Sequence, residues 1–239
     1  MHRFFAEKTG ESRAVLSPEE AAHALRVLRM KEGDACQALL EGALYDARID
    51  DISQGQVTLS LLEQLPSPEP SLRITLYQGL PKGDKMEWIA QKCTEAGVCR
   101  IVPVLFSRCV AKWDKKDDEK KLPRWQRIMA EAAKQSGRAI MPRMEAPITV
   151  KQLCAALPGH ELSLVPWEDQ MGNGIRQQWK GQRDIAIVIG PEGGMDAAEI
   201  EQMQAAGAQP VTLGPRIFRT ETAGLAAAIA LLALSGDME

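Results

Sequence analysis

The stretch IAIVIGPEGG (residues 185–194) decides the fold class of this 239-residue chain. Its first five residues are all apolar, which is typical of a strand buried on both faces of a parallel sheet. Three glycines among the next five residues let backbone groups approach a ligand closely. The stretch matches neither a P-loop nor the dinucleotide-binding pattern. A tight turn into a helix capped by Asp196 is an equally simple interpretation.

The segments around this stretch alternate between apolar strands and helical patterns. This alternation predicts an α/β domain with a parallel sheet covered on both faces. Parallel sheets bind ligands at the carboxyl ends of their strands, so the connections 190–195 and 214–220 are candidate sites. The expected strands are 72–77, 100–105, 161–165, 184–189 and 209–213, and the expected helices are 84–96, 121–137, 196–206 and 222–235.

The second candidate connection, LGPRIFRTETA (residues 213–223), holds two arginines, a glutamate and two threonines. Thr220 or Thr222 could cap the following helix, and Glu221 could interact with its dipole. Neither role explains why two arginines lie next to an otherwise apolar element.

The proline-rich segment PSPEP (residues 66–70) marks a domain boundary, because three prolines in five residues interrupt regular structure. We expect one domain over 1–70 and a second over 71–239. The first domain reads as a small closed barrel. Its expected strands are 3–6, 35–41, 43–50 and 56–62, and its one expected helix begins at Ser17, with Glu20 completing a capping box.

Charge is distributed unevenly along the chain. Residues 71–145 carry 16 basic and 9 acidic side chains, a net charge of +7, whereas the whole chain has a net charge of −3. A basic segment in an acidic protein indicates local contact with a polyanion, although a solvated helical face would give the same pattern.

Several classes of protein are disfavoured by composition. The longest apolar run, 225–234, is too short to span a bilayer, and the first residues lack the apolar core of a signal peptide. The five cysteines and three histidines do not have the spacing of a metal site. We therefore expect a cytoplasmic protein with no membrane segment and no metal.

The two connections, together with HALRVLRMKEGD (23–34), KGDKMEWIAQKCTEAGV (82–98) and RWQRIMAEAAKQSGR (124–138), resemble the RsmE-type 16S rRNA uridine-N3 methyltransferases of the SPOUT superfamily. The resemblance covers nearly the whole chain. Phe218 stands where the family is expected to have leucine, a conservative apolar change.

The resemblance implies a PUA-like RNA-binding barrel followed by a SPOUT domain, an α/β domain whose parallel sheet ends in a trefoil knot. It also implies a homodimer that uses S-adenosyl-L-methionine to form 3-methyluridine in the decoding region of 16S rRNA or of the small ribosomal subunit. By position, the cofactor-binding residues fall on the three knot loops: Leu164, Val165, Pro166, Ile189, Gly190, Pro191, Glu192, Gly194, Leu213, Gly214, Ile217, Phe218, Thr220, Thr222 and Ala223.

Methyl transfer to uracil N3 requires that N3 lose its proton. We expect Arg219 to orient the base and stabilise its charge, and Glu221 to accept the proton. An ion pair of Glu221 with Arg219 or Arg216 is an alternative role. The expected RNA contacts are Arg3, Arg26, Arg29, Lys82, Lys85 and Arg138.

Two other classes remain open from the residues alone. One is an α/β enzyme that binds a nucleotide phosphate in its glycine loop, and the other is a non-enzymatic RNA-binding or assembly factor. Stabilisation by S-adenosylmethionine in a thermal-shift experiment separates the methyltransferase from both.

Overall fold

The structure is a computed structural model that describes residues 1–40 and 42–239. Glu41, the last residue of the expected strand 35–41, lies outside the described residues. The chain forms two compact units: Met1–Glu69 with Ala133–Met141, and Pro70–Ala132 with Pro142–Glu239. The first break, at Glu69, is one residue from the expected boundary, but the segment 133–141 belongs to the first unit.

The first unit contains a closed barrel with the strand order β1-β2-β5-β4-β3. Neighbouring strands are antiparallel except for β1 and β3, which close the barrel in parallel. Strand β2 was not expected from the sequence, because its four residues are too few to show a pattern. The strands are β1 (Arg3–Lys8), β2 (Arg13–Leu16), β3 (Ala35–Leu40), β4 (Ala43–Ser53) and β5 (Gln56–Leu65).

The helical segment of the barrel begins where the sequence predicts, but it continues differently. α1 (Pro18–Ala22) starts after Ser17, whose hydroxyl accepts a hydrogen bond from the Glu20 backbone N–H. The expected capping box is incomplete, because the Glu20 carboxylate instead pairs with Lys134 Nζ at 2.7 Å. A π-helical turn follows over His23–Val27.

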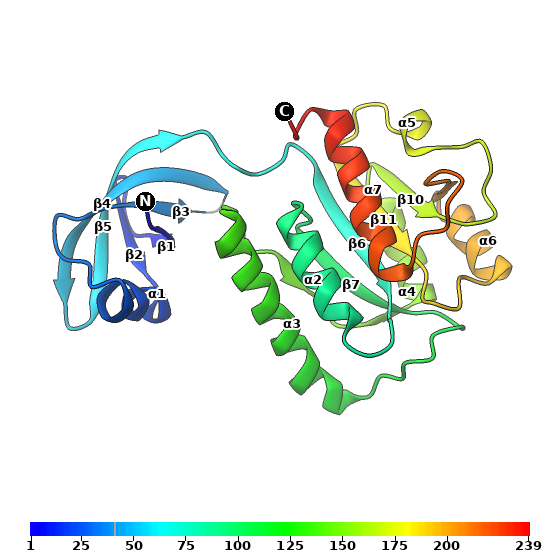
Figure 1. Ribbon diagram of the computed structural model, residues 1–239, viewed down its shortest axis with the longest axis horizontal. Helices are drawn as coiled ribbons and strands as arrows, with labels where there is room; N and C mark the ends of the chain where they lie inside the picture. Colours follow the sequence, from blue (N-terminus) through cyan, green and yellow to red (C-terminus); the bar gives the residue numbers. More distant parts are fainter. Residues whose placement is uncertain (41) are drawn as a thin grey trace. The chain divides into compact units, whose positions relative to one another are not determined.

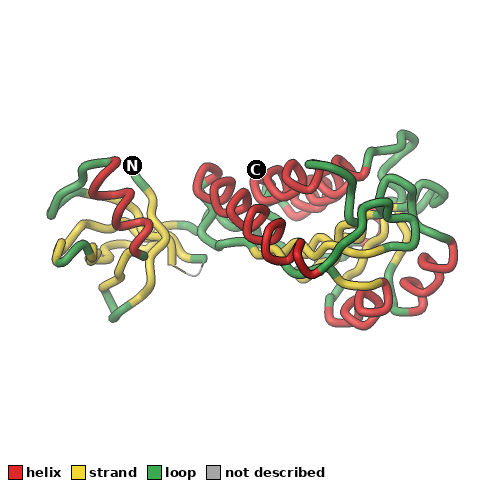
Figure 2. Tube along the Cα trace, turned by 90° about the horizontal axis from the view of Figure 1, so that it is seen from below, coloured by secondary structure: helices red, strands yellow, loops and turns green. Residues whose placement is uncertain are grey.

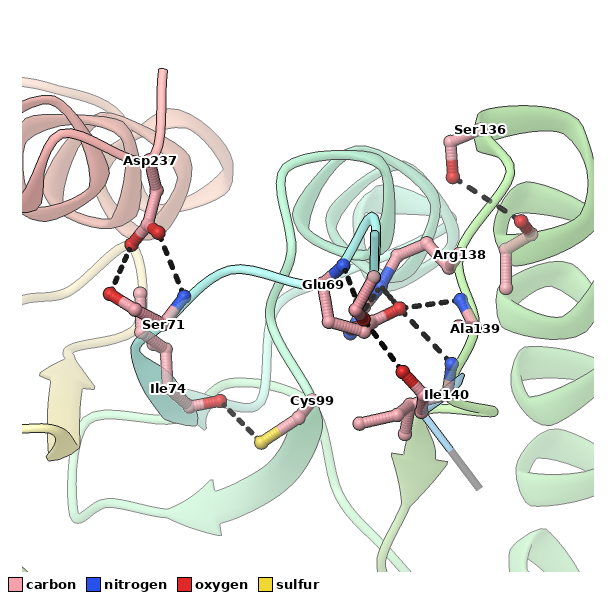
Figure 3. Close-up of polar contacts among 12 residues, drawn as sticks. Glu69, Ser71, Ile74, Cys99, Ser136, Arg138, Ala139, Ile140 and Asp237 are labelled. Carbon is pink, nitrogen blue, oxygen red and sulfur yellow. Dashed lines mark hydrogen bonds and ion pairs between the residues drawn. The ribbon is translucent and has the colours of Figure 1, made fainter. Parts of the chain in front are cut away.

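The segment 133–141 is tied to the barrel by a buried ion pair. Arg138 Nη2 donates to Glu69 Oε2 at 2.6 Å, and the two side chains are 5% and 9% exposed (Figure 3). Glu69 Oε1 also accepts from the backbone N–H groups of Ala139 and Ile140, at 2.6 and 3.0 Å. Both partners of the ion pair thus belong to the first unit.

The second unit is built on a parallel sheet, seven-stranded within the described residues, with the order β12-β10-β11-β6-β7-β8 and β9 paired to β7. The predicted parallel α/β architecture is confirmed. The short strands β8 and β9 were not expected. The strands are β6 (Arg73–Gly79), β7 (Arg100–Leu105), β8 (Arg143–Met144), β9 (Ile148–Thr149), β10 (Leu162–Pro166), β11 (Asp184–Ile189) and β12 (Gln209–Val211).

Helices cover both faces of this sheet (Figure 2). The core on one face joins the sheet to α2, α3 and α7, and the core on the other face joins it to α4 and α6. The sequence patterns missed α4 and α5, which are short. The helices are α2 (Lys85–Glu95), α3 (Lys115–Ser136), α4 (Val150–Ala156), α5 (Ile175–Gln178), α6 (Ala197–Ala205) and α7 (Thr220–Ser235).

The last part of the chain returns from the edge of the sheet to its middle. β12 is an edge strand, yet α7 packs against α2, β6 and β11 (Figure 1). The connection 212–219 therefore has to cross β10.

A second carboxylate anchors the end of the chain. Asp237 Oδ1 accepts from the Ser71 backbone N–H at 2.8 Å, and Oδ2 accepts from the Ser71 hydroxyl at 2.9 Å (Figure 3). Oδ2 also accepts from the Ser235 hydroxyl, at 2.6 Å. Burial raises the pKa of Asp237, but these hydrogen bonds lower it by more than burial raises it. The pKa of Asp237 therefore lies below the ordinary value.

A carboxyl group with a depressed pKa in the folded state stabilises the fold above its unfolded pKa, and this contribution disappears as the pH falls through the folded pKa. We expect Asp237→Ala to lower the free energy of unfolding by about 1–2 kcal/mol at neutral pH. The difference from the unmodified chain should shrink below roughly pH 4. Urea unfolding at several pH values measures it, and a difference independent of pH would contradict the assignment.

Candidate active site

A cavity of about 250 Å³ lies at the carboxyl ends of β10, β11 and β12. Its walls come from the connections that follow these three strands and from the first turn of α7. Eleven of the fifteen expected cofactor residues line it: Pro166, Ile189, Gly190, Pro191, Gly194, Leu213, Gly214, Ile217, Phe218, Thr220 and Ala223.

The other four expected cofactor residues are not among the lining residues. Leu164 and Val165 are buried within β10, at 0% and 1% exposure. The Glu192 carboxylate accepts from the Lys82 backbone N–H and from Lys85 Nζ. Thr222 lies in the first turn of α7, where its backbone N–H donates to Arg219.

Sequence reasoning missed part of the wall that follows β10. Trp167, Glu168 and Met171 line the cavity directly beyond Pro166, where the expected stretch ended. The rule that ligands bind at strand ends would have extended the prediction into this connection. Met195, Pro215 and Arg216 also line the cavity; they lie within the candidate connections 190–195 and 214–220 but were not named as cofactor residues, and Thr212 lies just outside them.

Two linked hydrogen bonds hold the glycine connection, which we define as residues 190–195, against β6 and α7. Gln78 Nε2 donates to Thr220 Oγ1 at 2.9 Å, and Thr220 Oγ1 donates to the Gly190 carbonyl at 2.6 Å. Gln78 is fully buried. Thr220 therefore links β6, the glycine connection and α7. It does not cap α7, whose N-cap residue is Arg219.

Gly79 brings the end of β6 against the same connection. A Cβ atom on Gly79 would lie 2.4 Å from the Pro191 nitrogen, a separation that real atoms do not reach. Only glycine allows this approach, so the position of the glycine connection depends on Gly79 as well as on its own residues.

Three charged side chains meet beside the cavity. Lys85 Nζ, in the first turn of α2, lies 2.9 Å from Glu192 Oε1 and 3.2 Å from Glu221 Oε2. The alternative role of Glu221 as an ion-pair partner thus occurs, but its partner is Lys85 and neither of the arginines considered. Arg219 is exposed at the N-terminus of α7.

The pKa values reflect this cluster. The hydrogen bond to Glu192 raises the pKa of Lys85 above its ordinary value; partial burial opposes this, and Glu221 adds to the rise. Burial works to raise the pKa of Glu192, but the hydrogen bonds from Lys85 and from the backbone outweigh it and lower the pKa. A charged ammonium between two carboxylates is therefore favoured at neutral pH.

The six expected RNA contacts have different surroundings. Arg26, Arg29 and Lys82 are exposed. Arg3 is also exposed, although its side chain donates to Gln37 Oε1 at 2.8 Å and to the Gly137 carbonyl. Lys85 is engaged by two carboxylates, as described above.

The expectation for Arg138 is wrong. Its guanidinium is 5% exposed and is bound to Glu69, so it is not available to a phosphate. Positive charge alone does not separate a surface arginine from one that neutralises a buried carboxylate.

Within the residues that the structure describes, no three His, Cys, Asp or Glu side chains are arranged to hold a metal ion. The helices of the same part of the chain include none with the length and apolar character needed to cross a bilayer.

The chain thus combines a closed barrel with a parallel-sheet domain that has a cavity at its strand ends, and family models identify both parts as those of RNA methyltransferases. Residues 67–232 match the RNA methyltransferase domain family, and residues 16–62 match the RNA methyltransferase PUA domain family.

Individual relatives narrow this class. Ribosomal RNA small subunit methyltransferase E of Bacillus subtilis is 34% identical to the chain, with 97% of this chain and 96% of the relative covered. The protein of the same name from Synechocystis is 35% identical, with coverage of 91% and 72%. The crystal structure of the Neisseria gonorrhoeae enzyme bound to S-adenosyl methionine has a TM-score of 0.82 and 31% identity, and 98% of each chain is covered. The chain belongs to the ribosomal RNA small subunit methyltransferase E family.

Proposed function

We propose that this protein transfers a methyl group from S-adenosyl-L-methionine to N3 of a uridine in the decoding region of 16S rRNA, forming 3-methyluridine. The observation that carries the proposal is the cavity at the ends of β10, β11 and β12, with Glu221 beside it. The choice of uridine N3 rests on the resemblance of the stretches 189–194 and 213–224 to the uridine-N3 methyltransferases.

The residues of the cavity fit the proposed cofactor. Phe218, Trp167 and Ile217 offer apolar surface for an adenine ring, and the Glu168 carboxylate offers a partner for a cationic ligand. The left-handed φ of +70° at Gly194, and the 2.9 Å at which a Cβ atom on Gly190 would meet Met195 Cγ, favour glycine at both positions, so neither places a side chain in the cavity. When bound, the cofactor supplies a methyl carbon attached to a sulfonium, which departs as a neutral thioether.

The protein's own part in the reaction is to prepare the acceptor. Uracil N3 carries a proton at neutral pH, and the N3–H bond must break so that the nitrogen lone pair can form the new bond to carbon. We assign proton acceptance to Glu221. Arg219, exposed at the same helix N-terminus, orients the base and stabilises the negative charge that develops on it.

The proposal is tested by nucleoside mass spectrometry of small ribosomal subunits that lack the modification, and of naked 16S rRNA, after incubation with protein and S-adenosylmethionine. We expect 3-methyluridine, and the contrast between the two substrates tells whether the assembled subunit is required. Another methylated nucleoside would overturn the target. Cofactor binding without any product would favour the assembly-factor function.

Glu168 provides a test of the cofactor site. We expect Glu168→Gln to weaken S-adenosylmethionine binding roughly tenfold, because a neutral amide replaces the charge that attracts the cationic ligand. Asp169→Asn is the matched control, since Asp169 is an exposed neighbour that does not line the cavity. Isothermal titration calorimetry measures both. Equal affinities for the two variants would place the cationic end of the ligand elsewhere.

Arg26 provides a test of the barrel as an RNA-binding surface. We expect Arg26→Ala to weaken RNA binding and to lower the slope of log affinity against log salt concentration by about 1, with cofactor binding unchanged. Arg13→Ala is the control, because Arg13 is already paired with Asp50 at 3.1 Å. Filter binding at several salt concentrations gives both slopes, and an unchanged slope for Arg26→Ala would remove it from the interface.

We also propose that the protein acts in the cytoplasm as a homodimer, as the resemblance implies. Supporting the dimer, α7 is apolar on nearly all sides, and Ile229 on it is 39% exposed. Sedimentation equilibrium tests the oligomeric state. A monomer with full activity would overturn the dimer.

A further inference from the structure

We propose that Lys85 is a positioning residue for methyl transfer: it connects the glycine connection to α7 and holds the Glu221 carboxylate in place for the reaction. This inference rests on the proposed function, in which Glu221 accepts the proton. It replaces the expected role of Lys85 as an RNA contact.

The first argument is where Lys85 lies. Its ammonium contacts Glu192, which follows β11 in the glycine connection, and Glu221, the second residue of α7. Three segments that are far apart in the sequence thus meet at one nitrogen atom. The connection that carries Glu192 also lines the cofactor cavity.

The second argument is that the backbone here is already fixed by other contacts. The hydrogen bonds from Gln78 to Thr220 and from Thr220 to Gly190 hold the start of α7 against the glycine connection. The Lys82 backbone N–H also binds Glu192 Oε1, at 3.1 Å. What Lys85 adds is therefore a constraint on the Glu221 side chain, which would otherwise sample several rotamers.

The third argument concerns the two oxygens of Glu221. Oε2 is buried and has no hydrogen-bond partner among the described residues, so its contact with the Lys85 ammonium at 3.2 Å is an ion pair; the side chain as a whole is 22% exposed. The exposed area therefore belongs to other atoms of the side chain. A carboxylate held at one oxygen presents its remaining atoms in a defined direction, which is what an aligned proton acceptor needs.

The fourth argument is charge. One ammonium lies between two carboxylates, so the cluster carries a net negative charge. An RNA phosphate approaching Lys85 would be repelled by Glu192 and Glu221. Phosphate binding needs a local excess of positive charge, which this cluster does not have.

The test compares Lys85→Met, Lys85→Arg and a control, Lys92→Met, in the methylation of small ribosomal subunits. Lys92 lies on the same helix and pairs with Glu95 at 2.9 Å, away from the cluster. We expect Lys85→Met to lower kcat tenfold or more while KM for the subunit changes less than twofold. Lys85→Arg should recover most of the loss, because arginine keeps the charge, and Lys92→Met should have no effect.

A double-variant cycle separates positioning from an independent effect. If Lys85 acts through Glu221, Lys85→Met should lower kcat less than twofold in a Glu221→Gln background. Effects that multiply in the double variant would overturn the proposal. So would a higher KM with a weaker salt dependence and an unchanged kcat, which is the behaviour of a phosphate contact.

A second readout does not depend on activity. In protein labelled with ¹³C-lysine, the NMR titration midpoint of the Lys85 ε-carbon should fall in both Glu192→Gln and Glu221→Gln, because each variant removes a partner that raises the pKa of Lys85. An unchanged midpoint in Glu221→Gln would overturn the proposal. If the unmodified protein forms no methylated nucleoside, the proposed function fails, and this titration still decides whether Lys85 bridges the two carboxylates.

Discussion

Glu221→Gln is expected to lower kcat for methyl transfer by about 10²–10⁴-fold, the usual contribution of a positioned acid–base group. Glutamine keeps the size of the side chain but has no affinity for the proton that uracil N3 must lose. Glu221 does not line the cavity, so the affinity for S-adenosylmethionine should stay within about twofold. Single-turnover kinetics on small subunits, with cofactor binding measured separately, give both quantities.

Glu95→Gln is the matched control, because Glu95 also pairs with a lysine but lies at the far end of α2. Its kcat should equal that of the unmodified protein. If Glu221→Gln instead lowered the melting temperature while kcat remained unchanged, the pair with Lys85 would be a structural link, and the proton would have another acceptor.

The parts of the site that follow from local sequence were predictable. Glycines after a buried strand, and a polar connection before an apolar helix, identify two of the three walls without any knowledge of the tertiary structure. The wall after β10 was only partly found, because Trp167 and Glu168 follow a stretch with no distinctive residues. There the position at the end of a strand was the only available signal.

Pairings between distant residues were not predictable in this way. Glu20 satisfies the sequence rule for a capping box, yet a lysine 114 positions away binds its carboxylate. Lys85 and Arg138 were both assigned to RNA because they lie in the basic segment. In each case the basic side chain pairs with a carboxylate from a distant part of the chain. Counting charges along a sequence does not show which charges pair in the fold.

Arg138→Met is expected to destabilise the first unit by about 3–5 kcal/mol, because it leaves the Glu69 carboxylate buried without its charge partner. For a unit of this size, such a loss lowers the melting temperature by roughly 10 °C or more. Differential scanning calorimetry measures it. An RNA contact would instead leave the melting temperature unchanged and weaken RNA binding, so the two roles of Arg138 give opposite results.

The double variant Glu69→Gln with Arg138→Met shows whether the buried charge is the cause. Glutamine at position 69 can still accept from the backbone N–H groups of Ala139 and Ile140, which bind Glu69 Oε1 here. The double variant has no buried charge, so it should recover more than half of the unfolding free energy that Arg138→Met loses. This recovery is expected even though the double variant makes fewer polar contacts than the single variant. A double variant less stable than Arg138→Met would mean that the hydrogen bonds, and not the charge balance, hold residues 133–141 to the barrel.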